Sequence, residues 1–162
     1  MNFDKTKIKK IEAACFFFKE KMNLQMMTDE TIREMESSPL ENLLSSWSKK
    51  KRVEFRDTSK ELRRTLQAEG DMFLAYDIAT NGKEGFVVTS KGVYVKSDGI
   101  KNYVDFEMLS EVGNLRFEDN ELRGDGNLLA VFDGSEEAKE RMIYFFEELI
   151  AILNGTYNAD DD

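Results

Sequence analysis

The strongest constraint on the fold is the stretch from Gly82 to Lys96, where two short apolar runs flank the turn residues SKG at positions 90–92. Both runs are rich in Val, Phe and Tyr, and Asn81-Gly82 lies just upstream. Glycine and asparagine accept the positive φ that tight turns need. The stretch therefore predicts a β-hairpin.

The same alternation of apolar runs and turn residues extends from residue 72 to residue 132 and predicts seven strands. We expect them over residues 72–79, 85–89, 92–96, 102–106, 114–118, 121–123 and 128–132. The breaks between them are rich in Gly, Asn, Asp and Ser, which turns favour for their backbone tolerance. Residues 128–132, LLAVF, are apolar throughout, which predicts the most buried strand.

Helical periodicity precedes this block. Apolar residues recur at intervals of three and four over residues 4–24, which predicts a helix with one apolar face: Ile8, Ile11, Cys15, Phe18 and Met22. Phe16 and Phe17 widen that face, which favours tertiary packing over a coiled coil. Further helices are predicted over residues 28–37, from Ser38 through Trp47, and over residues 57–68.

A final helix follows the last strand, from Ser135 to Leu153. Ser135 is a favourable N-cap, and Glu136 and Glu137 lie where the helix dipole favours anions. Apolar residues form one broad stripe along this helix, and Gly155 marks its end. The acidic tail, residues 156–162, is expected to be disordered.

This order of elements, seven short antiparallel strands and then an amphipathic helix, is that of a pleckstrin-homology-like (PH-like) barrel. The sequence also resembles a bacterial family of PH-like domains in the runs NGKEGFVVT (81–89), GVYVK (92–96) and YVDF (103–106), with Leu109 and Val112 after them. The resemblance covers residues 68–155. It implies a seven-stranded antiparallel barrel or sandwich over these residues, capped by the C-terminal helix. With the helical periodicity of residues 1–67, the whole chain is expected to be α+β, a helical N-terminal region (1–67) followed by the PH-like unit (68–155).

Charge is distributed unevenly along the 162 residues, whose net charge is -9. Residues 1–67 carry 15 Lys and Arg against 11 Asp and Glu, whereas residues 68–162 carry 8 against 21. The acidic part would be repelled by nucleic acid and by anionic membranes. Lys83 and Lys91 are the only cations between Asp71 and Val95, so the basic run of lipid-binding PH-like domains is missing. We expect neither nucleic acid nor membrane as a partner.

The residue types argue against catalysis. The chain has no histidine, the commonest general base and metal ligand, and the lone Cys15 lies on a predicted apolar face. One Cys and no His cannot supply four zinc ligands of nitrogen and sulfur. Residues 119–124 place carboxylates before a glycine, as in a calcium loop, but Arg123 interrupts the ligand pattern and a hairpin is favoured. We predict no enzyme, no cofactor and no metal site.

One basic cluster is a candidate partner-binding site: Trp47, Lys49, Lys50, Lys51 and Arg52. An aromatic anchor beside cations fits an acidic partner. The alternatives are a solvated helix end, where cations suit the dipole, and docking of this basic segment on the acidic part of the same chain.

The sequence therefore favours an interaction or scaffold module that binds an unidentified protein through a PH-like domain, as the resemblance also implies. One alternative is an acidic inhibitor or immunity protein that blocks a basic toxin or nuclease. Another is binding to a lipid surface. The longest apolar run, residues 13–18, is far shorter than the roughly 20 residues that span a bilayer, and Glu12 and Lys19 bound it. We expect a cytoplasmic protein.

Overall fold

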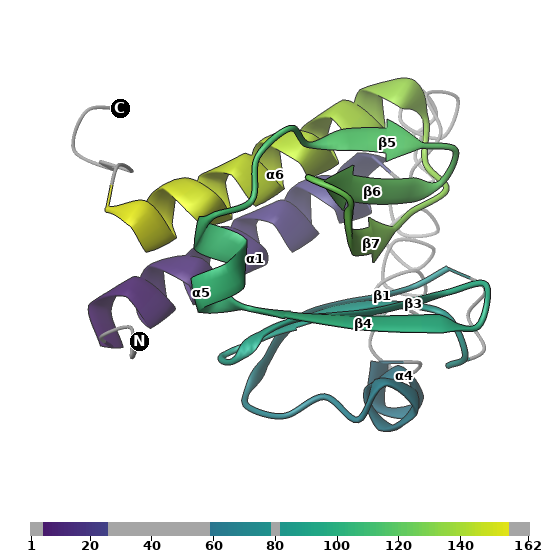
Figure 1. Cartoon of the computed structure of the whole chain (residues 1–162), viewed down its shortest axis with the longest axis horizontal. Helices are drawn as coiled ribbons and strands as arrows, with labels where there is room; N and C mark the ends of the chain where they lie inside the picture. The colour runs from purple at the N-terminus through teal and green to yellow at the C-terminus, as the bar shows by residue number, and fades with distance from the viewer. Residues whose placement is uncertain (1–4, 26–58, 79–81, 156–162) are drawn as a thin grey trace, which may run out of the picture.

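The computed structural model describes residues 5–25, 59–78 and 82–155 of the chain (Figure 1). The helices predicted over residues 28–37 and from Ser38 through Trp47, and the predicted disordered tail, lie outside these residues.

The first four strands form one antiparallel sheet in chain order. They are β1 (Met72–Asp77), β2 (Gly85–Thr89), β3 (Gly92–Ser97) and β4 (Ile100–Asp105). In the central hairpin Val87 lies opposite Tyr94, and Tyr94 lies opposite Tyr103 on the next strand. The hairpin predicted from residues 82–96 is confirmed as the β2–β3 pair.

The other three strands form a second antiparallel sheet. They are β5 (Arg116–Glu118), β6 (Glu121–Gly124) and β7 (Asn127–Val131). A short helix that the sequence did not predict, α5 (Phe106–Ser110), separates the two sheets in the chain. Asp105 caps it by accepting a hydrogen bond from the backbone N–H of Met108 at 2.8 Å.

The fold is α+β, as predicted, but the strands do not close into a barrel. In the described part of the chain β4 pairs only with β3, and β5 pairs only with β6, so the two sheets stay separate. β4 and β5 do not pair because of the segment that connects them. Helix α5 and the residues after it carry the chain away from β4 before β5 begins.

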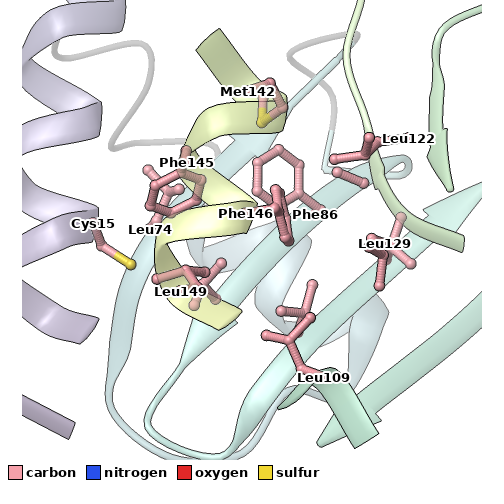
Figure 2. Packing of buried hydrophobic residues seen from close by; sticks show 14 of the residues in the cluster. Cys15, Leu74, Phe86, Leu109, Leu122, Leu129, Met142, Phe145, Phe146 and Leu149 are labelled. Atoms are coloured by element: carbon pink, nitrogen blue, oxygen red, sulfur yellow. The ribbon is translucent and has the colours of Figure 1, made fainter. Parts of the chain in front are cut away.

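The C-terminal helix α6 (Glu136–Asn154) packs against both sheets, with Ser135 as N-cap and Gly155 in the left-handed conformation as C-cap. Its stripe of buried residues includes Met142, Phe146 and Leu149, which Figure 2 shows in the core beside side chains of β2, β6 and β7. The prediction for this helix is confirmed.

Residues 128–132 are all buried, and β2 is buried equally throughout.

Two helices from the N-terminal region cover opposite sides of the first sheet (Figure 1). Helix α1 (Lys5–Gln25) runs antiparallel beside α6, since Phe18 stacks on Phe145 at 4.2 Å and the Lys7 Nζ donates to the Leu153 carbonyl at 3.0 Å. Helix α4 (Ser59–Leu66) packs Leu62 on the far face of the sheet. The division at residue 67 into two regions stays a prediction.

Candidate functional site

The basic cluster predicted as a partner-binding site lies outside the described residues. This holds for Trp47 and for Lys49, Lys50, Lys51 and Arg52. The cluster therefore stays a prediction, and the candidate surfaces below are built from other residues.

The lone thiol is part of the core. Cys15 is fully buried on the inward face of α1, and its side chain points toward α6 (Figure 2). Burial, together with the nearby carboxylates of Glu148 and Glu12, raises the pKa of the thiol far above its ordinary value. A thiol held in its neutral form is a poor nucleophile. The interpretation of Cys15 as a buried apolar residue is confirmed.

The carboxylates of the described residues do not cluster as a cation site. Over residues 5–25, 59–78 and 82–155, no three His, Cys, Asp or Glu side chains are placed to hold a metal ion. Asp119 and Asn120 form the turn between β5 and β6, and Arg123 pairs with Glu121 at 2.8 Å. The hairpin interpretation of residues 119–124 is confirmed.

The outer face of the β5–β6 hairpin holds a hollow of about 800 Å³ whose walls are charged. Like charges face each other across the strands, with Arg116 opposite Arg123 and Glu118 opposite Glu121. Ion pairs along and across the strands offset this repulsion, at 2.7 Å for Arg116–Glu118 and 3.9 Å for Arg123–Glu118. Hydrogen bonds from Arg123 and Ser97 lower the pKa of Glu121. The charges that line the hollow are exposed or half-buried, and most of them pair with one another.

The outer face of α1 is different, because it exposes two adjacent phenylalanines. Phe16 is 57% exposed and Phe17 is 63% exposed, and their rings meet edge to face with centroids 5.8 Å apart. The prediction that they widen the packing face is wrong. A helix turns about 100° per residue, so Ile11, Cys15 and Phe18 occupy the inward face and the residues between Cys15 and Phe18 point away from it.

Other large apolar side chains are exposed singly. Tyr144 on α6 is 59% exposed, and its hydroxyl donates to Glu140 at 3.2 Å. Ile100 and Met108 lie at the start and beyond the end of β4. Isolated exposed apolar residues are ordinary on protein surfaces, whereas adjoining ones mark interaction sites. The Phe16–Phe17 pair is therefore the best candidate site in the part of the chain that the structure describes.

Comparison with protein-family models, with curated proteins and with solved structures gave no match to this chain. None of the helices that the structure describes combines the length and the apolar character needed to cross a membrane.

Proposed function

We propose that this chain is a non-catalytic module that binds another protein, and that its sheets and C-terminal helix form a PH-like sandwich. The order of the elements supports a PH-like fold. Four antiparallel strands, three further antiparallel strands and a terminal helix follow one another, as in PH-like domains. The buried side chains of helix α6 share one core with residues of both sheets, which is the place expected of the capping helix in a PH-like fold.

The observation that carries the proposed function is the exposure of Phe16 and Phe17 on a helix whose other face is packed. Phenylalanine is enriched at the buried centres of protein–protein interfaces, where a few large anchors contribute most of the affinity. Two adjoining rings that expose more than half of their surface are the kind of anchor that a protein partner covers.

Affinity purification of the full chain from its native host tests the proposed function. We expect a protein that co-purifies in a fixed stoichiometry and stays bound through washing at moderate salt. The matched comparison is a chain that carries Tyr144→Ala, which removes an exposed aromatic residue from α6 and leaves the pair on α1 in place. Recovery of a bound small molecule in place of any stoichiometric protein would overturn the proposal.

A second candidate, an acidic inhibitor of a basic protein, is favoured by the outer face of α6. This face exposes Glu136, Glu140 and Glu147, and both cations of the helix already have partners. Arg141 pairs with Glu137 at 3.3 Å, and Lys139 donates to the Asp119 carbonyl at 2.8 Å.

The inhibitor proposal predicts an association rate that falls steeply with salt, because complementary charges steer the encounter. The rate would also fall when Glu140 and Glu147 are reversed to Lys. An association rate that ignores both changes would exclude this surface. Charge reversals at Glu118, Asp119 and Glu121 test the other acidic surface in the same way.

A further inference from the structure

We infer that the outer face of α1 docks an acidic, amphipathic helical segment of the partner protein. The inference rests on the proposed function and names the chemistry of the partner. It depends on four exposed residues of α1, Lys9, Lys10, Phe16 and Phe17, which together we call the α1 outer face.

The four side chains form two columns along the helix. Lys9 precedes Phe16 by seven residues, and Lys10 precedes Phe17 by seven. Seven residues turn an α-helix to within about 20° of a whole number of turns and advance it by roughly 10 Å. Each lysine is therefore two turns from a phenylalanine on the same side, opposite the buried Ile11 and Cys15.

The two lysines have no carboxylate partner within the described part of the chain. Neither Lys9 nor Lys10 forms an ion pair there, whereas the exposed guanidinium groups of three arginines do: Arg64, Arg116 and Arg141. Glu12 is the one acidic residue among residues 5–19 of α1. The α1 outer face thus has a cationic half and an aromatic half, and its charge complement is a group of carboxylates.

A protein segment fits this face better than a membrane or a nucleic acid. The neighbouring helix α6 exposes Glu140 and Glu147, which would repel a continuous anionic surface. Nucleic acid affinity grows with the number of phosphates neutralised, and among residues 5–19 of α1 only Lys5 adds a further exposed cation to the two lysines. A discrete helix can place its carboxylates on the lysines and stay clear of α6.

The spacing on α1 defines the segment that it would bind. The carboxylates of the partner must lie about 10 Å from its apolar anchors, which is two turns of a helix. An amphipathic helix with Asp or Glu seven residues from Leu or Phe meets this requirement. Covering the two rings contributes affinity, and the charge pairs at the rim contribute orientation and association rate.

A designed peptide tests the inference with the full chain. The probe is a fluorescent helical peptide that carries two adjacent Glu residues and, seven residues further on, two adjacent Leu residues on an Ala and Gln background. Fluorescence anisotropy measures its Kd. We expect saturable binding that weakens roughly tenfold or more in Phe16→Ala and Phe17→Ala. A Lys9→Glu, Lys10→Glu double variant should weaken binding and reverse the direction of its salt dependence, because added salt then screens a repulsion.

Two controls match these variants. Lys101→Glu reverses an exposed cation on β4, and Tyr144→Ala removes an exposed ring on α6, and both should bind the peptide as the unchanged chain does. A second peptide with Lys in place of Glu should bind less tightly. All four residues of the α1 outer face are exposed, so their substitution leaves the core intact, which circular dichroism verifies.

Several results would overturn the inference. These are an absence of saturable binding by the acidic peptide, equal binding by all the variants, and tighter binding of the Lys peptide. Flotation with phosphatidylserine vesicles that depends on Lys9 and Phe16 would assign the face to a membrane. Self-association lost in the same variants would assign it to a second copy of the chain. If Phe16→Ala, Phe17→Ala retains the co-purified partner, this inference fails while the proposed function stands.

Discussion

Phe145 lies where α1, α6 and the core meet. Its ring stacks on Phe18 at 4.2 Å and meets Phe146 edge to face at 5.4 Å, and Phe146 in turn faces Phe86 of β2 at 6.1 Å. The chain of rings links a helix near the N-terminus, the C-terminal helix and the central hairpin. Removal of one ring leaves a cavity, because the helices hold the neighbouring side chains in place and these side chains cannot move to fill it.

We therefore expect Phe145→Ala to lower the free energy of unfolding by about 3–5 kcal/mol. Urea unfolding followed by circular dichroism measures the change. The neighbouring substitution Tyr144→Ala is the control, because Tyr144 is exposed and its loss should change stability by less than about 0.5 kcal/mol. Equal effects of the two substitutions would show that α6 does not pack as the structure describes.

Tyr103 gives a prediction of pH dependence. Burial, together with the neighbouring Tyr94 hydroxyl and the charges of Asp105 and Glu69, raises the pKa of Tyr103 from 10.0 to about 12. Its hydroxyl donates to the Lys91 carbonyl at 3.3 Å. Because the folded chain keeps this proton to a higher pH than the unfolded chain does, stability should fall as pH rises from 10 toward 12.

The ultraviolet absorbance of phenolate, compared between the unchanged chain and Tyr103→Phe, isolates the titration of this group. We expect the difference curve to have its midpoint near pH 12 while circular dichroism shows an intact fold. A midpoint near 10 in the folded chain would contradict the surroundings of Tyr103 described above.

At the scale of elements, the glycines of the central hairpin do more than form turns. Gly85 opens β2 opposite Asp77, and a Cβ on Gly85 would lie 2.0 Å from the Tyr76 carbonyl oxygen. We expect Gly85→Ala to destabilise the fold by about 1–3 kcal/mol, because two paired strands would have to separate. Thermal unfolding measures this.

Gly113→Ala is the control for Gly85→Ala. A Cβ on Gly113 meets its nearest neighbour, an Asp125 oxygen, at an ordinary 3.6 Å. If Gly85→Ala lowers stability no more than Gly113→Ala does, β1 and β2 do not lie as close together at Gly85 as the structure describes.

The elements that could be predicted from the sequence are those whose apolar residues recur many times. Helices α1, α4 and α6 repeat their period often enough to be recognised, and the strands are recognised as apolar runs between turn residues. Helix α5 could not be found in this way, because five residues make less than two turns. The division of the strands into two sheets could not be predicted either, because no local sequence pattern shows whether β4 pairs with β5.

The α1 outer face could be predicted only in part. The angular positions of Phe16 and Phe17 follow from the helical period, and comparison with Ile11 and Phe18 would have placed them outside the core. Whether Lys9 and Lys10 have carboxylate partners could not be deduced from the sequence. Any carboxylate that pairs with them would come from an element distant in the chain, and sequence spacing does not show which elements become neighbours.

At the scale of the whole molecule, α1 is part of the same core as the sheets. Ile11, Ala14, Cys15 and Phe18 are buried in one cluster with residues of β2, β7 and α6. Elements that share a core open together, so their amides exchange with solvent at similar free energies. This bears on the predicted division of the chain at residue 67, which would allow the N-terminal helix to open by itself.

Native-state hydrogen exchange decides between these behaviours. We expect the slowest amides of α1, over residues 8–18, to be protected to within roughly tenfold of the slowest amides of α6. Phe18→Ala should lower protection in both helices, because the ring that it removes stacks on Phe145 of α6. Phe17→Ala removes an identical but exposed ring one position away and should lower neither. Protection lost in α1 alone would show that α1 opens independently of the core, and the boundary at residue 67 would then separate two folding units.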